Sequence, residues 1–400
     1  MTGRPHRVEQ CGRLDRGGRI DRGRPIVFTF EGRRLTGFAG DTLASALLAN
    51  GVKIVGRSFK YHRPRGFLSA GAEEPNGLVT LGEGGRRTPN VAATTVELHE
   101  GLVAARQNGW PSADFDLMAL TGLAAPFFEA GFYYKTFMGP GRRGWMLYEP
   151  FIRRAAGLGR GGHARDPDRY EVRHAYTDVL VIGGGPAGLA AARAAAATGL
   201  RVCLVEQDFA LGGSLLATPA DSSHEIWRAG LEETLRAQPK VELRIRTSAF
   251  GVYDGNSVAL IERRDQARPD PARGLAREIV VMMRAPAIVY ATGAAERPLL
   301  FADNDRPGVM LASAVRTYVN RFAVAPGRRA VVATNNDGAW RTAFDLAAAG
   351  VAVTVLDERK AVAPALLESA QRCGVAPRLD ARIARARGRR ALCGVEFLVG

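Results

Sequence analysis

The glycine-rich stretch from Gly183 to Gly188 constrains the fold of this chain more than any other feature. It follows a short β-branched run, opens an alanine-rich helix that Gly199 ends, and leads to a second apolar strand finishing at Glu206. The G-x-G-x-x-G spacing allows a tight turn, close approach of a pyrophosphate and close packing of helix on strand. The alternative is a glycine turn that only packs a βαβ unit. The acid about 20 residues later favours a dinucleotide site.

Each part of this unit has a predicted role. Gly183 makes the turn, Gly185 admits the pyrophosphate, and Gly188 lets the helix pack on the strand. The N-terminus of the helix directs free N–H groups at the phosphates. Glu206 can accept hydrogen bonds from both ribose hydroxyls and would repel a 2′-phosphate. The sequence therefore predicts NAD or FAD rather than NADP.

The segment after Glu206 contains two further patterns of flavoproteins. Gly212, Gly213 and Ser214 resemble the turn that lines the cofactor in two-dinucleotide flavoproteins, where Ser214 can donate a hydrogen bond. A helix is expected over residues 226–238, and strands are expected over 241–250 and 257–263. A strand over 287–291 then ends in an Ala-Thr-Gly turn, as in disulfide-reductase-like flavoproteins. That likeness places two more residues beside the nucleotide, namely Thr292 and Gly293.

A second βαβ pattern begins at Arg329, and Asp357 occupies its ribose-acid position. Its glycine turn is degraded, because the three fingerprint positions hold Thr334, Asn336 and Ala339. Thr334 lacks the conformational freedom of glycine, and the Asn336 side chain obstructs a phosphate. The sequence predicts a Rossmann unit that does not bind a dinucleotide.

The N-terminal part resembles the β-grasp fold of [2Fe–2S] ferredoxins. Strands are expected over 25–30, 35–38 and 78–81, with a short helix over 43–49. In such ferredoxins a C-x4-C-x2-C loop precedes the last of these strands.

The cluster-ligand positions of that loop hold no cysteine. Counting back from the strand places them at Ser69, Glu74 and Gly77, and no cysteine lies between Cys11 and Cys203. We therefore expect a ferredoxin-like domain without an iron–sulfur cluster. A basic loop before these positions is either a rim for a flavin phosphate or partner subunit, or a solvated loop; it carries Arg57, Lys60, His62, Arg63 and Arg65.

The expected organisation is an α/β chain of five parts: a basic arm (1–24), the ferredoxin-like domain (25–100), a connector (101–172), a NAD/FAD-type dinucleotide-binding domain (173–293) and a second, degenerate and truncated Rossmann-like domain (294–400). The arm arginines contact an acidic partner or belong to a solvated tail; they are Arg13, Arg16, Arg19, Arg22 and Arg24. The connector aromatics are expected to pack on other domains or a partner; they are Trp110, Phe127, Phe128, Phe132, Tyr133, Tyr134, Trp145 and Tyr148.

Composition narrows the function classes. The net charge of +15 comes mostly from scattered arginines without a recognition helix, which argues against a nucleic-acid binder and suits acidic partner subunits. The four cysteines form no C-x-x-C pair, which excludes a disulfide framework and a dithiol centre. The N-terminus has no apolar signal segment, and no apolar run of about 18 residues exists. We expect a cytoplasmic protein without a membrane span.

Several long stretches resemble one family, the α subunits of heterotetrameric sarcosine oxidases, over essentially the whole chain. They include the β-grasp segment followed by GRSFKYHRPRGFLSAGAEEPN, GFYYKTFMGP, LYEPFIRRAAGLGR, VIGGGPAGLAAARAAA and LGGSLL. Multi-subunit proline and opine dehydrogenases and hydrogen cyanide synthase share this architecture more loosely.

The resemblance implies an oxidoreductase that converts sarcosine to glycine, formaldehyde (or methylene-tetrahydrofolate) and hydrogen peroxide, acting on a CH–NH donor with oxygen as acceptor. It places FAD in the β subunit, FMN at the α/β interface and NAD on this chain, with γ and δ subunits as further partners. The NAD residues carried over are Gly183, Gly185, Ala187, Gly188, Glu206, Gln207, Asp208 and Ser214.

The resemblance also implies a C-terminal tetrahydrofolate-binding domain, so we interpret this sequence as an N-terminal portion of a longer subunit. It assigns no catalytic residue to this chain. One rival is a self-contained FAD- or NAD-dependent oxidoreductase, against which the degraded second fingerprint argues. Another is a structural scaffold. An inseparable partner with covalent flavin is expected only of the oxidase subunit.

Overall fold

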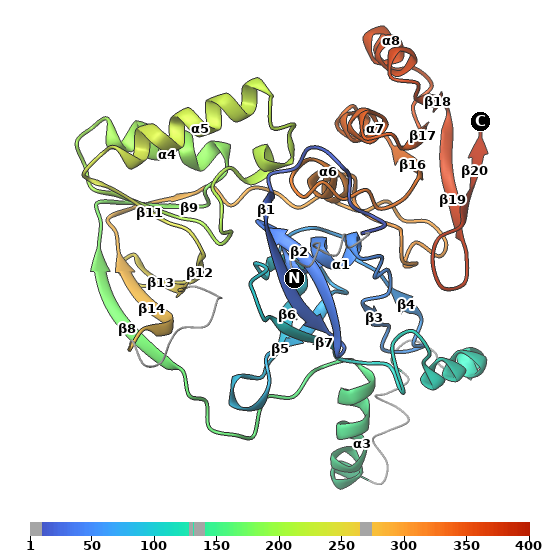
Figure 1. Cartoon of the computed structure of the whole chain (residues 1–400), viewed down its shortest axis with the longest axis horizontal. Coiled ribbons are helices and arrows are strands. Elements are labelled where there is room, and N and C mark those ends of the chain that lie inside the picture. The colour runs from blue at the N-terminus through green and yellow to red at the C-terminus, as the bar shows by residue number, and fades with distance from the viewer. Residues whose placement is uncertain (1–9, 128–130, 132–140, 265–273) are drawn as a thin grey trace, which may run out of the picture.

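A computed structural model describes residues 10–127, 131, 141–264 and 274–400. The ferredoxin-like domain lies at the centre, the first nucleotide domain lies beside it, and the C-terminal part packs on the other side (Figure 1). Within the described residues no helix is long and apolar enough to cross a bilayer.

The ferredoxin-like domain is a mixed five-stranded sheet of order β2-β1-β7-β5-β6 with helix α1 on one face. Strands β1 and β7 run parallel, and the other pairs are antiparallel. The hairpin between β1 and β2 turns at Glu31 and Gly32, both with positive φ. The elements are β1 (Asp21–Phe30), β2 (Arg33–Ala39), α1 (Leu43–Ala49), β5 (Leu78–Leu81), β6 (Thr88–Ala92) and β7 (Val103–Arg106).

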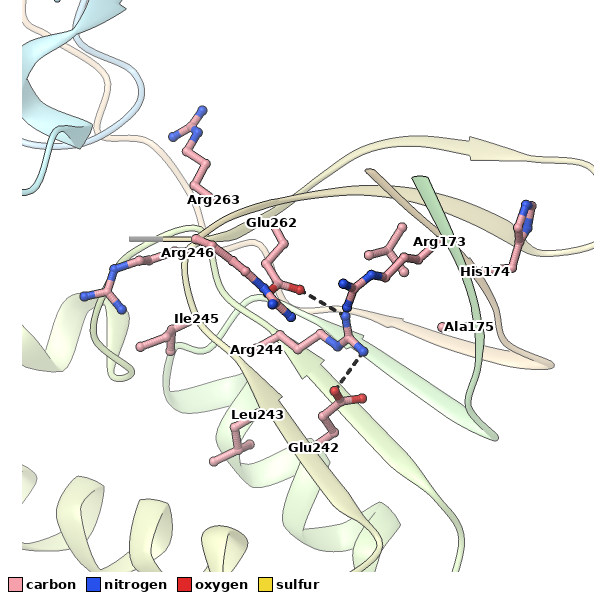
Figure 2. Close-up of a pocket in the computed structure, with 12 residues that line it drawn as sticks. Arg173, His174, Ala175, Glu242, Leu243, Arg244, Ile245, Arg246, Glu262 and Arg263 are labelled. Atoms are coloured by element: carbon pink, nitrogen blue, oxygen red, sulfur yellow. Dashed lines mark hydrogen bonds and ion pairs between the residues drawn. The ribbon is translucent and has the colours of Figure 1, made fainter. Parts of the chain in front are cut away.

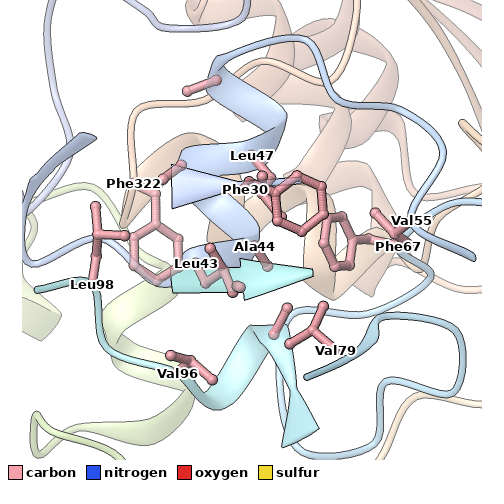
Figure 3. Close-up of a cluster of buried hydrophobic side chains, with 14 of the residues drawn as sticks. Phe30, Leu43, Ala44, Leu47, Val55, Phe67, Val79, Val96, Leu98 and Phe322 are labelled. Atoms are coloured by element: carbon pink, nitrogen blue, oxygen red, sulfur yellow. The ribbon is translucent and has the colours of Figure 1, made fainter. Parts of the chain in front are cut away.

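The core of this domain is shared with the C-terminal part of the chain. Phe30, Leu43, Leu47 and Phe67 pack between sheet and helix, and Phe322 joins them from the segment after helix α6 (Ala312–Asn320) (Figure 3). Burial of these side chains is the dominant favourable contribution to such a core. Folding of the two parts is therefore coupled.

Four short elements lie within this domain, between α1 and β7: β3 (Gly56–Arg57), β4 (Pro64–Arg65), η1 (Gly84–Arg86) and η2 (Ala93–Thr95). Two more, η3 (Leu117–Phe127) and α3 (Gly141–Ala155), lie between β7 and the nucleotide domain. Several apolar side chains of the connector are exposed in this chain, including Trp110, Leu120, Leu123, Met146, Leu147, Tyr148 and Phe151. Trp145 is half-buried. Phe128, Phe132, Tyr133 and Tyr134, with the Phe127 side chain, lie outside the described residues.

The nucleotide domain contains two stacked sheets. A parallel sheet of order β11-β10-β9-β15 carries helices α4 and α5 on one face. Its other face packs on a sheet of order β12-β13-β14-β8. The elements are β8 (Arg169–Tyr176), β9 (Val179–Ile182), α4 (Pro186–Ala196), β10 (Val202–Val205), η4 (Gly213–Ala217), α5 (Ser223–Arg236), β11 (Val241–Arg244), β12 (Thr247–Tyr253), β13 (Ser257–Arg263), β14 (Ala276–Arg284) and β15 (Ala287–Tyr290).

The C-terminal part has a parallel three-stranded sheet of order β16-β17-β18 and a separate β19–β20 hairpin. Its elements, besides α6, are β16 (Arg329–Thr334), α7 (Gly338–Ala348), β17 (Ala352–Asp357), α8 (Pro364–Arg372), β18 (Ala376–Arg378), β19 (Ala381–Arg387) and β20 (Gly394–Val399).

Three segments differ from the expectation. The strand expected over 241–250 is divided at Arg246, whose positive φ ends β11 and directs β12 into the second sheet. Strand β7 begins within the expected connector but belongs to the ferredoxin-like sheet. Strand β8 also begins within the expected connector, at Arg169, but belongs to the second sheet of the nucleotide domain. A short strand without a clear alternation of apolar and polar residues forms because it pairs with neighbouring strands, and local sequence does not show that pairing.

Candidate dinucleotide site

Two of the three fingerprint glycines are required by close packing. Gly183 has φ +105°, and a Cβ atom placed on it would lie 2.3 Å from the carbonyl oxygen of Ala291. A Cβ atom on Gly188 would lie 1.8 Å from the carbonyl oxygen of Gly183. A side chain at either position would separate strand, turn and helix. These two glycines therefore build the turn.

Gly185 has a different role. Its φ of −74° suits any residue, and a Cβ atom placed there would meet nothing nearer than the Cα of Gly213 at 3.9 Å. The space above it is therefore open. Gly185 caps helix α4, and Ala187 and Gly188 lie in the first turn, whose N–H groups have no partner within a helix. This open cradle fits the phosphate group of a dinucleotide.

Glu206 follows strand β10 and is buried beneath the turn. Its Oε2 accepts the N–H of Gly184 at 2.6 Å, and Oε1 accepts the N–H of Asp208 at 2.8 Å. Burial raises the pKa of this carboxyl, and the two N–H groups act in the opposite direction. Each carboxylate oxygen retains a second acceptor position for a ribose hydroxyl.

The other two residues assigned to the ribose differ from Glu206. Gln207 is exposed. Asp208 accepts two hydrogen bonds from Arg321, at 2.6 and 2.7 Å, and the guanidinium also lies over the rings of Phe209 and Phe322. Asp208 therefore ties the nucleotide domain to the end of helix α6.

The remaining assigned residues lie at the same edge of the sheet. Gly213 has a positive φ, and a Cβ atom there would lie 2.9 Å from the Cα of Gly185. Ser214 is exposed at the start of η4, and Thr292 and Gly293 are exposed just after β15. The structure thus gathers the assigned residues at the carboxyl ends of parallel strands, where open α/β sheets bind ligands.

Sequence reasoning missed Arg19 as a support of this edge. Its Nε donates to the carbonyl of Leu216 and its Nη2 to that of Thr218, both at 3.2 Å, and it pairs with Glu225 at 2.6 Å. No local signal could have found these partners, which lie about 200 residues away in the chain.

The arm arginines correct an expectation. The side chains of Arg13, Arg19 and Arg22 bind groups of this same chain and do not form a solvated tail. Arg13 pairs with Asp41 at 2.7 Å, and Arg22 donates to the carbonyl of Leu14. Arg16 and Arg24 are exposed.

The second βαβ unit fills its own turn with side chains. The Oγ1 of Thr334 accepts the N–H of Asn336 at 3.1 Å. Asp357 is fully buried and accepts the indole N–H of Trp340 at 2.8 Å, and Arg359 pairs with it at the same distance. Burial alone would raise the pKa of Asp357, but these hydrogen bonds outweigh it and leave the pKa lowered.

Comparison with known proteins decides the family. A model described as pyridine nucleotide-disulphide oxidoreductase matches residues 177–396, more than half of the chain. The chain belongs to this family. A second model, described as 2Fe-2S iron-sulfur cluster binding domain, matches residues 23–109. The two matches confirm the expected order of a ferredoxin-like domain followed by a disulfide-reductase-like nucleotide region.

This member of the pyridine nucleotide-disulphide oxidoreductase family is also similar to curated α subunits. Sarcosine oxidase subunit alpha of Rhizobium meliloti (strain 1021) is 51% identical over 360 residues, covering 89% of this chain and 36% of the relative. Its counterpart in Corynebacterium sp. (strain P-1) is 38% identical over 374 residues, covering 91% and 33%. The expected resemblance is confirmed. The chain spans about a third of the length of these relatives.

One solved structure has the same fold over most of the chain. L-proline dehydrogenase from P. horikoshii aligns with a TM-score of 0.55 and 21% identity, covering 94% of this chain and 57% of that chain. This likeness concerns the fold alone.

The ferredoxin-like model implies an iron–sulfur cluster, which the loop does not fit. At the ligand positions, Glu74 is buried and its carboxylate accepts four backbone N–H groups, from Leu68, Ser69, Asn76 and Gly77, at 2.7 to 3.1 Å. A carboxylate thus occupies the centre of the loop, and thiolates are absent from it. Among the described residues, no group of three or more His, Cys, Asp or Glu side chains is placed to hold a metal ion.

Proposed function

We propose that this chain is the dinucleotide-binding α subunit of a multi-subunit sarcosine oxidase. The complex would demethylate sarcosine to glycine, with formaldehyde (or methylene-tetrahydrofolate) and hydrogen peroxide as further products. The open cradle at Gly185 carries the binding part of the proposal. The 51% identity to a sarcosine oxidase subunit alpha supports the choice of enzyme.

The dinucleotide of the proposal is NAD. It would lie with its pyrophosphate at Gly183, Gly185, Ala187 and Gly188, and its ribose at Glu206. The carboxylate of Glu206 disfavours a 2′-phosphate, which argues against NADP. The remaining residues assigned to the site are Gln207, Asp208, Gly213, Ser214, Thr292 and Gly293.

The proposal places the redox chemistry largely outside this chain. The described cysteines are all free, and burial raises the pKa of the Cys203 thiol to about 12, so it stays protonated at neutral pH. Dithiol chemistry of the kind named by the family model is therefore not supported. FAD in the β subunit would oxidise the amine, and FMN at the α/β interface would pass electrons to oxygen. Tetrahydrofolate would bind a domain outside this sequence.

Exposed apolar side chains of the connector support a partner subunit. Leu123, Met146, Leu147 and Phe151 are each more than two-thirds exposed in this chain, which is unusual for a stable surface. The proposed partners are the β, γ and δ subunits, in the cytoplasm. Neither nucleic acid nor a membrane is a proposed partner.

The test is to denature the purified complex, identify the nucleotides released into solution and measure the flavin that stays bound to each separated subunit. NAD+ released in about one equivalent, with covalent flavin remaining on a different subunit, is the expected result. FAD recovered from this chain would replace the NAD assignment. A chain that purifies alone and oxidises sarcosine would overturn the division of labour.

A further inference from the structure

A hollow lies away from the dinucleotide site, between the two sheets of the nucleotide domain (Figure 2). Its volume is about 570 Å³, which is in the range of small-molecule sites. Its walls come from β8, from β11 and the residues after it, and from the end of β13. None of the residues assigned to the dinucleotide lines it.

Arginine side chains from three different strands reach this hollow. Arg173 of β8 and Arg244 of β11 point toward one another, and Glu262 points at Arg244 (Figure 2). Arg244 lies between two carboxylates, 2.8 Å from Glu242 and 3.2 Å from Glu262. Arg264 holds the same Glu262 at 2.9 Å. The guanidinium groups are thus fixed in place by carboxylates.

One guanidinium donor in the hollow is left without an acceptor. The Nε of Arg244 is buried and donates to no described atom, although both of its Nη groups are paired. A ligand in the hollow does not reach this enclosed atom, but each Nη group of Arg244 carries two N–H donors and pairs with one glutamate, which leaves an N–H for an acceptor oxygen of a ligand.

The charged side chains around the hollow favour an anionic ligand. Five arginines line it, namely Arg173, Arg244, Arg246, Arg263 and Arg264. Four glutamates pair with them: Glu242 and Glu262 within the hollow, and Glu171 and Glu97 beside it. Arg169 shares Glu171 with Arg173, so six arginines meet four glutamates around the hollow, and this net positive charge suits an anion.

We propose that this hollow binds a small metabolite through one carboxylate group, which accepts hydrogen bonds from Arg244 and its arginine neighbours. Guanidinium groups match carboxylates in geometry and form charge-assisted hydrogen bonds with them. Ala175 and Val281, which belong to the core between the two sheets, line the same hollow and offer apolar contacts to the rest of the molecule.

The test compares butyrate with its neutral isostere butyramide on the full-length protein in its native assembly, with binding followed by ligand-observed NMR. The expected result is binding of butyrate and none of butyramide. Equal binding of acid and amide, or no binding of butyrate, would overturn the proposal. Tighter binding of inorganic phosphate at this hollow would also overturn it, because phosphate makes no use of the apolar part of the lining.

Two variants locate the site. Arg264→Gln and Arg173→Gln alter side chains that are 42% and 48% exposed, so both should fold. Each is expected to weaken butyrate binding about tenfold, the effect of losing one charge-assisted hydrogen bond. Arg236→Gln is the matched control, since its side chain is 57% exposed, pairs with Glu232 and lies outside the hollow. Equal affinities in Arg264→Gln, Arg173→Gln and Arg236→Gln would contradict the assignment.

Discussion

The two βαβ units of this chain have the same backbone arrangement, but the turn is open in the first and filled by side chains in the second. In each, a strand, a helix and a parallel strand lead to a buried acid, Glu206 in the first and Asp357 in the second. The first acid binds backbone N–H groups and leaves the space above Gly185 open. The second binds Trp340 and Arg359. The second unit therefore keeps the Rossmann fold although Trp340 and Arg359 occupy the acceptor positions of its acid.

The largest expected effect concerns the open cradle. Gly185→Val should reduce NAD affinity at least 100-fold, because its side chain fills only the space assigned to the phosphate. Its φ is ordinary, so the melting temperature should stay near that of the nucleotide-free wild type. Isothermal titration and calorimetric melting measure the two quantities.

Gly230→Ala is the matched control for that variant, since its helical position has open space around it. It should retain full NAD affinity. A Gly185→Val protein that still carries a full equivalent of NAD would move the nucleotide away from this turn.

The second largest effect is expected at Asp357 in the second βαβ unit. Asp357→Asn should lower the free energy of unfolding by about 2–4 kcal/mol, because a buried carboxylate that Arg359 and Trp340 hold is lost. Nucleotide content should not change. Urea unfolding is the measurement. Asp337→Asn is the control: it also pairs with Arg359, but its side chain is 63% exposed, so less than about 1 kcal/mol is expected. Equal losses in both variants would contradict a special role for Asp357.

The two acids should also differ in their response to pH. The pKa of Asp357 is lowered in the folded protein, so its contribution is present above its unfolded pKa of about 3.9 and is lost as pH falls through the folded value. The deficit of Asp357→Asn should therefore narrow below about pH 4. Burial raises the pKa of Glu206, whose ionisation weakens the fold as pH rises through the folded value. Carboxyl ¹³C shifts should show Glu206 titrating at the higher pH; the reverse order would contradict the comparison.

The smallest effect concerns one hydrogen bond. Trp340→Phe removes the indole N–H that Asp357 accepts and should cost about 1–2 kcal/mol of unfolding free energy. Trp227→Phe changes a partly exposed indole and should cost less than about 0.5 kcal/mol. If Trp340→Phe gained nucleotide binding, the indole alone would be what prevents the second unit from binding a nucleotide.

Local sequence was sufficient for the first unit. The glycine spacing and the acid after the second strand placed the turn, helix α4 and Glu206 correctly, because each depends on backbone conformation within about 25 residues. The degraded fingerprint likewise identified a unit of Rossmann outline. It could not show that Trp340 binds Asp357, since a tryptophan in a helix usually indicates only core packing.

The contacts that sequence could not supply are distant ones. Arg321 meets Asp208 across 113 residues, and Arg19 reaches carbonyls about 200 residues away. Strand β7 has only four residues, and its pairing with β1 and β5 decides its place in the sheet. Tertiary contacts of this kind override local preference.

The four N–H groups around Glu74 also bear on how this protein matures. In a ferredoxin the cysteine loop folds around its cluster, and binding of the metal contributes to folding. Here the negative charge at the centre of the loop is translated with the chain. Closure of the loop is therefore independent of iron supply and insensitive to the oxidants that destroy clusters. That independence suits a subunit of an enzyme proposed to release hydrogen peroxide beside it.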